Sequence, residues 1–324
     1  MKKGIKIFLT VALICLIGGL CLVFAGFAAT GFDPTGFVNA KLVSNSYSFD
    51  INDFDSISVD ISVQDLRIVR SDTEGNTVTV NTRFEENANL NSTVEVINGS
   101  LSIIEREIKW HHKIHIFSSK QTVEIILPKN FSAESITIDI DTGDTVIESV
   151  EARSLKLEGD TGDVRVASSD ITNVSIELDT GDVEINQLNA SILKIDNDTG
   201  ELDITDSSVT DKVNATTETG DVEIKRLNAN TLSVETDTGD VSIEETILTG
   251  KLTVSTDTGD IDFESSDAAE IDIRSDSGDV DLYLLSAKIF DVDSVTGRVR
   301  VPLSGEGGVC KIRTSTGDIE VRVK

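Results

Sequence analysis

A glycine that returns every 19 or 20 residues constrains this chain more than any other feature. It stands at ten positions: Gly143, Gly162, Gly181, Gly200, Gly220, Gly239, Gly259, Gly278, Gly297 and Gly317. The residue before it is always Thr or Ser, and flanking acids give the consensus Asp-Thr-Gly-Asp. Such a fixed short period is typical of solenoids, whose stacked units bury a face that none could bury alone.

Apolar and polar residues alternate on both sides of each glycine. An apolar residue stands five positions before it in every repeat, and Val, Leu or Ile stands two positions after it from Val164 onward. This alternation predicts two short strands per repeat, each with one buried face, and the glycine predicts a sharp turn between them. Leu188 and Leu227 are expected to point inward at a looser second corner. The first repeat is expected to be one residue out of register, at Val146.

Equivalent residues recur in the same order, so successive coils are expected to stack in parallel, in register and in sequence order. The predicted fold class is therefore all-β, a single-chain parallel β-solenoid (β-helix) of about ten coils over residues 131–324. At a strand spacing of about 4.8 Å, ten coils would make a rod roughly 45–50 Å long.

Acidic residues are concentrated in the repeats. The whole chain carries a net charge of −29, and residues 131–297 alone hold 40 Asp and Glu against 10 Lys and Arg. A surface this acidic repels nucleic acid, so no nucleic-acid partner is expected. Asp-Thr-Gly is also the triplet of aspartic proteases, but ten tandem copies cannot each be half of a dyad that shares one proton. The acids are periodic and do not converge on one groove, so we expect no enzyme and no catalytic residue.

Two rows of carboxylates flank the glycines. The full consensus supplies Asp141, Asp144, Asp160, Asp163, Asp179, Asp182, Asp237, Asp240, Asp257 and Asp260. Charges about 4.8 Å apart in water repel by about 0.9 kcal/mol, so each row needs an offset. Either the Asp oxygens accept backbone N–H groups and face solvent, or weakly bound Ca²⁺ or Mg²⁺ bridges successive coils. No other cofactor is expected.

The N-terminal region has the pattern of a membrane anchor. Lys2, Lys3 and Lys6 precede an uncharged run at 7–29, which is long enough to span a bilayer. The lysines place residues 1–6 in the cytoplasm and the C-terminal domain outside it. We predict a single-pass signal-anchor in the cell membrane. A cleavable signal peptide, cut near Gly26-Phe27-Ala28, is the alternative.

Two segments separate this anchor from the repeats. Residues 30–48 are expected to be a linker, and residues 49–130 an irregular β cap or first coils. The strands expected in the cap are 57–63, 66–70, 77–82, 93–97, 101–105 and 122–127. His111 and His115 could share a strand face as metal ligands, but their spacing is not characteristic, and a solvated ridge is favoured.

The last repeats depart from the acidic pattern. Val295 and Arg298 replace both acids of the ninth repeat, and Arg298 is expected to reach Asp279 and Asp318. Arg322 and Lys324 are expected to protect the edge of the last strand. This basic tip indicates either an electrostatic end cap or head-to-tail self-association with an acidic rod. Cys310 falls in an inward column and is expected to be buried.

The Asp-Thr-Gly-Asp coils, the segment Ile126-Leu127-Pro128 that leads into them, and the apolar N-terminus resemble the bacterial putative adhesin family of β-strand-repeat proteins, a domain of unknown function. The resemblance covers roughly residues 49–324. It implies a cell-envelope location and carries over no catalytic residue, and some relatives resemble components linked to envelope-stress regulation. The expected function is a non-enzymatic surface adhesin or scaffold with an unknown protein or envelope partner. The alternative is a cation-responsive accessory factor or sensor in the envelope-stress response.

Overall fold

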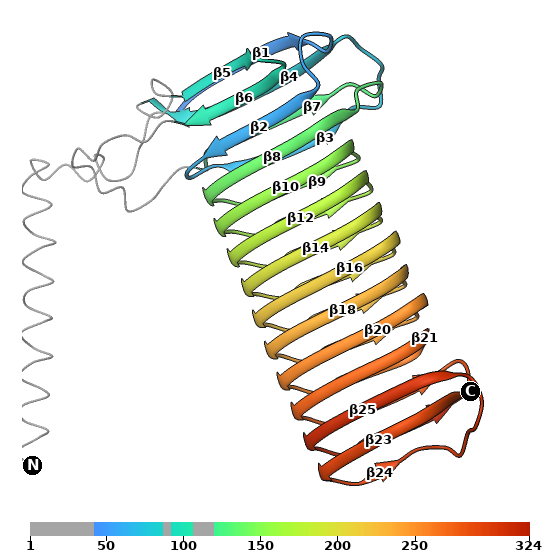
Figure 1. Ribbon diagram of the computed structural model, residues 1–324. Helices are drawn as coiled ribbons and strands as arrows, with labels where there is room; N and C mark the ends of the chain where they lie inside the picture. The colour runs from blue at the N-terminus through green and yellow to red at the C-terminus, as the bar shows by residue number, and fades with distance from the viewer. Residues whose placement is uncertain (1–41, 87–91, 106–119) are drawn as a thin grey trace, which may run out of the picture.

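A computed structural model describes residues 42–86, 92–105 and 120–324, and this part of the chain is all-β. Its strands wind into a long rod, a parallel β-solenoid of about nine turns (Figure 1). The repeat predicts one turn more. The second strand of the repeat around Gly297 has only two residues, Val299 and Arg300.

Two parallel sheets run along the rod. The long-strand sheet contains, in spatial order, β8 (Ala133–Thr142), β10 (Glu151–Thr161), β12 (Asp170–Thr180), β14 (Asn189–Thr199), β16 (Ser208–Thr219), β18 (Asn228–Thr238), β20 (Ile247–Thr258), the second half of β21 (Ile261–Ser277), β25 (Gly308–Thr316) and β23 (Lys288–Thr296). The short-strand sheet contains β9 (Thr145–Glu148), β11 (Val164–Ala167), β13 (Val183–Asn186), β15 (Leu202–Thr205), β17 (Val222–Lys225), β19 (Val241–Glu244), the first half of β21, β22 (Val280–Leu284), β26 (Ile319–Val323) and β24 (Val299–Arg300).

The aliphatic core lies between the two sheets, as the alternation predicts. Leu188 and Leu227 have no exposed surface at the second corner. The expected register slip in the first repeat is wrong, because Thr145 pairs with Val164 and takes the inward position in place of Val146. The parallel ladder thereby keeps Ile147 opposite Val166.

The second corner of each turn needs a left-handed backbone without a glycine. Residues six positions after the glycines have φ of about +50°: Ser149, Ser168, Gln187, Asp206, Arg226, Glu245 and Ser265. Beside them, Ser169, Ser207, Thr246 and Ser266 are buried, and each hydroxyl accepts a backbone N–H from the preceding turn at 2.9–3.2 Å. Hydrogen bonds between turns hold this corner in place of glycine, and the apolar columns alone do not predict it.

A cap closes the N-terminal end of the rod. It consists of β1 (Leu42–Asp50), β2 (Ser56–Ile61), β3 (Asp65–Arg70), β4 (Thr77–Glu85), β5 (Ser92–Ile97), β6 (Ser100–Glu105) and β7 (Thr122–Leu127). β2 and β3 pair with β8 and β9, β6 and β7 lie beyond them, and antiparallel β1, β4 and β5 cover the end. Val78, Val80 and Phe84 have no exposed surface there, so the core is closed at this end.

One expected boundary is wrong, because β1 begins at Leu42, inside the segment predicted as a linker to residue 48. The predicted cytoplasmic N-terminus, signal-anchor and most of the linker lie outside the described residues, as do His111 and His115. Within the ranges that the structure describes, no helix is long and apolar enough to cross a membrane.

The order of turns at the distal end differs from the order of the sequence. β25 and β26, which belong to the last repeat, lie between β21–β22 and β23–β24 (Figure 1). The expectation that coils stack in sequence order is therefore wrong at this end. Arg322 does not protect an edge strand, because β26 has neighbours on both sides and β23 and β24 end the rod.

Hydrogen bonding at the glycine corner agrees with this exchange. In the interior turns, with Glu201 as the exception among the described residues, the acid after the glycine accepts the backbone N–H of the next turn, and Asp318 does so for Arg298 at 2.8 Å. Arg298 has no acceptor to offer in return, so placing its repeat at the end of the rod loses no such bond. The Arg298 side chain also donates hydrogen bonds to Asp318, as expected. It was expected to reach Asp279 as well, but no hydrogen bond joins these two side chains within the described residues.

Glycines also allow the last repeat to enter the stack. A Cβ at Gly307 would lie 2.0 Å from the Ala287 oxygen, and one at Gly308 would lie 1.7 Å from the Ala269 oxygen. Only glycine fits between these backbones. Cys310 follows in β25 and is buried as expected, and burial raises the pKa of its thiol to about 12.

Candidate functional site

The ten predicted turn glycines form one line along the rod. Nine of them have φ between +136° and +156°, and Gly297 at the distal end is the exception. A Cβ at Gly162, Gly200 or Gly220 would lie only 1.9–2.2 Å from the carbonyl oxygen of the glycine before it in the stack. The turn therefore needs glycine for its backbone angle and also for the close approach of successive backbones.

A buried polar column lies three positions before the glycines from Gly200 onward, whereas the first three repeats have Ile140, Gly159 and Leu178 there. It contains Asn197, Thr217, Thr236, Thr256, Ser275 and Thr314. The Asn197 amide donates to the Gly181 oxygen at 3.1 Å, and half-buried Ser294 donates to the Gly317 oxygen at 2.8 Å. Thr236 and Thr314 reach glycine oxygens at 3.5 Å, whereas the hydroxyls of Thr217, Thr256 and Ser275 have no hydrogen-bond partner within the described structure.

The acids directly after the glycines form a hydrogen-bonded ladder. Asp144 Oδ1 accepts the backbone N–H of Asp163, and Asp163 Oδ1 accepts that of Asp182. The same contact recurs from Asp221 to Asp240, Asp260, Asp279 and Asp318, at 2.7–2.8 Å. These bonds offset the repulsion between neighbouring carboxylates, because each carboxylate satisfies a backbone donor. For this row they agree with the first of the two interpretations, in which the Asp oxygens accept backbone N–H groups.

Glu201 interrupts the ladder. Its own N–H donates to Asp182 at 2.9 Å, but within the described chain its carboxylate accepts no backbone N–H from Asp221. Its side chain is one methylene longer than that of Asp. We expect Glu201→Asp to complete the ladder and to raise the free energy of unfolding by about 0.5–1.5 kcal/mol.

Chemical denaturation of the Glu201→Asp variant measures this gain. Asp182→Glu is the matched control, because it adds a methylene where the bond exists and should destabilise by a similar amount. A Glu201→Asp variant no more stable than the original chain would show that the ladder contributes nothing.

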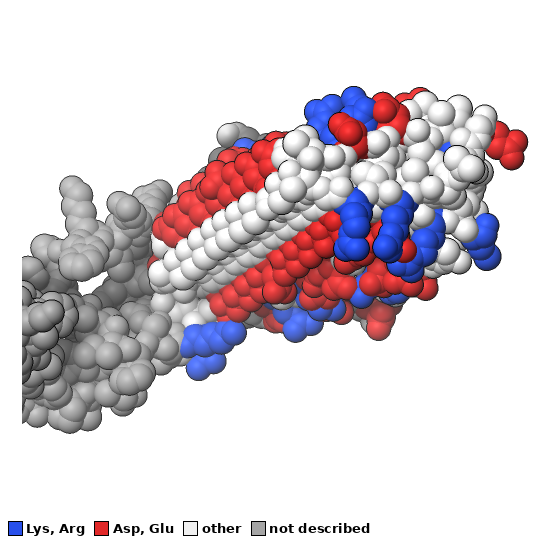
Figure 2. Space-filling view, turned by 90° about the horizontal axis from the view of Figure 1, so that it is seen from below, with Lys and Arg blue, Asp and Glu red and all other residues white. Residues whose placement is uncertain are grey.

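The acids two positions before the glycines are arranged differently. Asp141, Asp160, Asp179, Asp237 and Asp257 are exposed, and within the described chain no hydrogen bond or ion pair joins them to a neighbour. Figure 2 shows the two acidic rows as red bands on either side of a white band. No group of three or more His, Cys, Asp or Glu in the described residues is placed to hold a metal ion. Cation binding by the rows stays a prediction.

A third set of carboxylates lies on the outer faces of the sheets. Burial, followed by the charge of Glu223, raises the pKa of Asp203, and burial beside Asp281 does the same for Asp262. The pKa values of Asp139 and Asp281 are raised for the same kinds of reason. Conversely, hydrogen bonds from Arg226 and Arg298 lower the pKa values of Asp206 and Asp318.

These shifts predict that mild acid stabilises the rod. A carboxyl whose pKa is higher in the folded state binds protons more readily there, so stability rises as pH falls from neutral toward the unfolded value of 3.8. Asp206 and Asp318 instead stabilise the folded state at neutral pH, because their pKa values are lower in the folded state. This stabilisation is lost only at lower pH, as the pH falls through those lowered pKa values.

Thermal melts between pH 7.5 and about 4.5, at constant ionic strength, check this prediction. Asp203→Asn serves as the control, because it should be more stable at neutral pH and should rise less on acidification. A melting temperature that falls steadily over this range would contradict the account.

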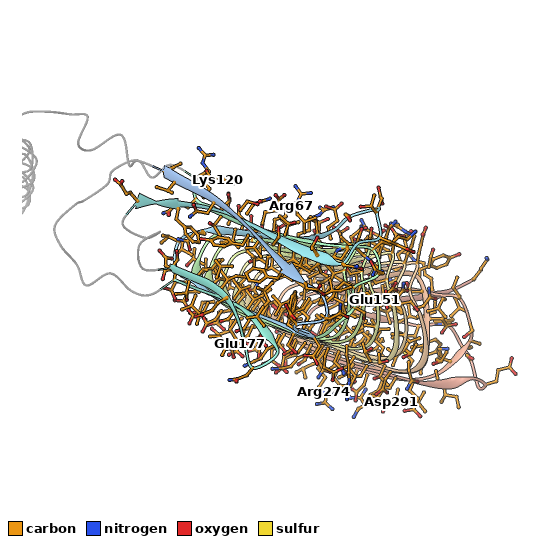
Figure 3. All side chains as sticks on the ribbon, turned by 90° about the horizontal axis from the view of Figure 1, so that it is seen from above. Arg67, Lys120, Glu151, Glu177, Arg274 and Asp291 are labelled. Carbon is orange, nitrogen blue, oxygen red and sulfur yellow. The ribbon has the colours of Figure 1, made fainter. Side chains whose placement is uncertain are left out.

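A groove beside the cap has a volume of about 680 Å³. Arg67, Arg83 and Lys120 line it together with Asp65 and Glu124. Figure 3 shows Arg67 and Lys120 projecting from one side of the rod, and Glu177, Arg274 and Asp291 from the other. Lys120 pairs with Asp65 at 2.6 Å and Arg67 with Glu148 at 3.2 Å. The groove therefore presents paired charges.

These features of the fold agree with a family comparison. The family model described as Toastrack DUF4097 matches residues 54–226 and 206–324. The chain belongs to this family. The Toastrack match thus extends over the cap from β2 onward and over all ten glycine corners, and it agrees with the resemblance drawn from the repeats. No curated protein is similar enough to the chain to match it.

Several solved structures resemble the chain at low sequence identity. A putative adhesin from Parabacteroides distasonis is 16% identical, with a TM-score of 0.51 over 87% of this chain and 98% of that chain. A putative adhesin from Bacteroides fragilis is 14% identical, with a TM-score of 0.45 and the same coverage. A putative lipid binding protein from Parabacteroides distasonis is 16% identical, with a TM-score of 0.41 over 85% and 96%. At 16% identity, the likeness to the first of these structures is one of fold alone.

Proposed function

We propose that this Toastrack protein is a non-enzymatic adhesin or scaffold that is anchored in the cell membrane and presents an acidic rod outside it. The observation that carries the proposal is the use of the carboxylates after the glycines. They hold the backbone of successive turns together, as a structural rod requires, and do not converge on a substrate. The fold shared with a structure described as a putative adhesin supports the same function.

Mechanically, the rod is suited to holding a surface at a fixed distance. Each turn is joined to the next by two parallel ladders and by the carboxylate bonds at the corner. An anchor before residue 42 would place the closed cap near the membrane and the ninth repeat farthest from it. The partner would then be an envelope or cell-surface component, and not nucleic acid, because the rod is acidic.

Deleting whole turns tests the proposal. Removal of residues 163–220 joins Gly162 to Asp221 and preserves the corner sequence. Binding of the full chain to intact envelope material should fall in steps as turns are removed. As a control, exchanging one interior turn for the sequence of another should leave binding unchanged. Absence of binding at every length would overturn the proposal.

The exposed acidic row motivates the second candidate, a cation-responsive accessory factor or sensor. Millimolar Ca²⁺ or Mg²⁺ should then raise stability by more than about 1–2 kcal/mol. The carboxylates after the glycines already accept N–H bonds, so we favour the first candidate and expect no more stabilisation than a monovalent salt gives at equal ionic strength. A larger, ion-specific stabilisation would favour the second.

A further inference from the structure

The core is covered at one end of the rod but partly exposed at the other. The cap buries the core completely at one end, but inward-facing Val299 and Val301 at the distal end are still 41% and 36% exposed. Among the described strands, β23 pairs only with β25 and β24 only with β26. Both sheets therefore end in a strand edge that can accept another strand.

These two edges carry opposite charges. Arg298 and Arg300 point outward beside β24, whereas Asp291 and Asp293 point outward from β23. Arg298 is already paired with Asp318 at 2.7 Å, and Asp291 with Arg313 at 2.6 Å. Arg300 lies 3.8 Å from Glu320 but is 65% exposed, and Asp293 makes no ion pair within the described residues, so these two side chains carry the charge that faces a partner. A partner that fits this end must place acid beside one edge and base beside the other.

We infer that a second copy of this chain occupies the distal end, in a tail-to-tail dimer about a twofold axis parallel to the strands. Such a rotation keeps the line of each strand but exchanges the two sheets. β23 of one copy then lies antiparallel to β24 of the other, with glycine corner over glycine corner. Each edge meets the edge of opposite charge, and every contact occurs twice.

The positions of the charges fit this arrangement. Asp293 stands four residues before Gly297, and Arg300 stands three residues after it. Inward and outward positions alternate on both strands, so Arg300 of one copy lies opposite Asp293 of the second copy. The half-covered Phe290, Val292 and Val299 are buried at the same time.

Two other arrangements fit less well. A twofold axis perpendicular to the sheets would pair β23 with β23 and bring Asp291 and Asp293 of the two copies together, which is repulsive. Head-to-tail stacking would set the open end against the closed cap, where Val78 and Phe84 are already covered.

The dimer has a consequence that rests on the proposed function. Its two caps lie at opposite ends of a rod of double length. Copies anchored before residue 42 would therefore meet from facing surfaces, and the protein would bind its own kind on another cell or envelope.

Sedimentation equilibrium of the full chain in density-matched detergent tests the dimer. Arg300→Glu and Asp293→Arg should each weaken dimerisation about 10- to 100-fold, because each breaks two ion pairs. The double variant R300E/D293R restores both pairs in exchanged form and should recover most of the affinity. Lys212→Glu, the same reversal at an exposed residue in the middle of the rod, should change nothing.

A chain that stays monomeric, or a double variant no better than the single ones, would overturn the dimer. So would masses that grow beyond the dimer, which indicate head-to-tail stacking, or association that none of the tip variants changes. The envelope-binding assay separates this failure from that of the proposed function. If Arg300→Glu abolishes the dimer while envelope binding disappears at every rod length, the function fails and the dimer stands.

Discussion

Replacing Gly220 with Ala should destabilise the protein by at least about 3 kcal/mol or prevent the middle of the rod from forming. Gly220 has a φ of +152°, and a Cβ there would lie 1.9 Å from the Gly200 oxygen and 2.6 Å from its carbonyl carbon. Backbone atoms on both sides belong to ladders that continue along the rod, so neither can move away without breaking hydrogen bonds to the next turn. Chemical denaturation followed by circular dichroism measures the loss.

Two other glycines separate the causes of this effect. Gly99 has a φ of +79°, and a Cβ there would have no neighbouring atom within 4 Å, so Gly99→Ala should cost only about 1–2 kcal/mol for the backbone angle. Gly305 has open space and an ordinary φ, so Gly305→Ala should be nearly neutral. If Gly220→Ala cost no more than Gly99→Ala, the close stacking of the corners would be wrong.

The second large effect is expected at Ile312. This side chain in β25 has no exposed surface, because the last repeat lies inside the stack with a turn on each side. Ile312→Ala should therefore cost about 2–5 kcal/mol, as in any well-packed core. If the repeats stacked in sequence order, β25 would be the end strand and the cost would be smaller. Equilibrium unfolding in urea gives the value.

A matched pair of valines provides the control for this prediction. Val321 and Val301 stand at the same position of their repeats, four residues after the glycine, but they are 5% and 36% exposed. Val321→Ala should cost about 1.5 kcal/mol or more, and Val301→Ala clearly less. If Val301→Ala lowered the free energy of unfolding more than Val321→Ala does, the ninth repeat would lie inside the rod and the last repeat at its end.

The sequence predicts the middle of the rod well because its residues follow one repeated pattern. The columns that contain Leu157 and Val166 determine which side chains face inward, and the glycines determine where the chain turns. The hydrogen-bonding role of Asp163 was one of two readings of the acidic rows. The column of Thr236 was missed, because a polar residue inside a corner is indistinguishable in sequence from one that faces solvent.

The ends were less predictable, because there the stacking order is decided by single residues and not by the repeat. Arg298 cannot accept the N–H that a further turn would offer, so its repeat loses no such bond by lying at the end of the rod. Gly307 and Gly308 were the available signal that the chain passes between two backbones. At the second corner, Gln187 and Glu245 adopt left-handed angles that their residue types do not favour, so only hydrogen bonds between turns reveal them.

Disulfide trapping tests the order of turns most directly. Arg274 is in register with Arg313, and Arg313 with Asp293, so residues 274 and 293 are two turns apart. Neighbouring strands are about 4.8 Å apart and alternate ones about 9.6 Å, and a disulfide cannot join Cα atoms more than about 7 Å apart. Cys15 and Cys21 are replaced by Ser, and buried Cys310 is left in place because its raised pKa keeps it unreactive.

Under mild oxidation, the chain with Arg274→Cys and Arg313→Cys should form an intramolecular disulfide, and the chain with Arg274→Cys and Asp293→Cys should not. Peptide mass spectrometry of the monomer identifies the bond in each case. Trapping of residue 274 with residue 293, but not with residue 313, would show that the turns follow the sequence and would contradict the inserted last repeat.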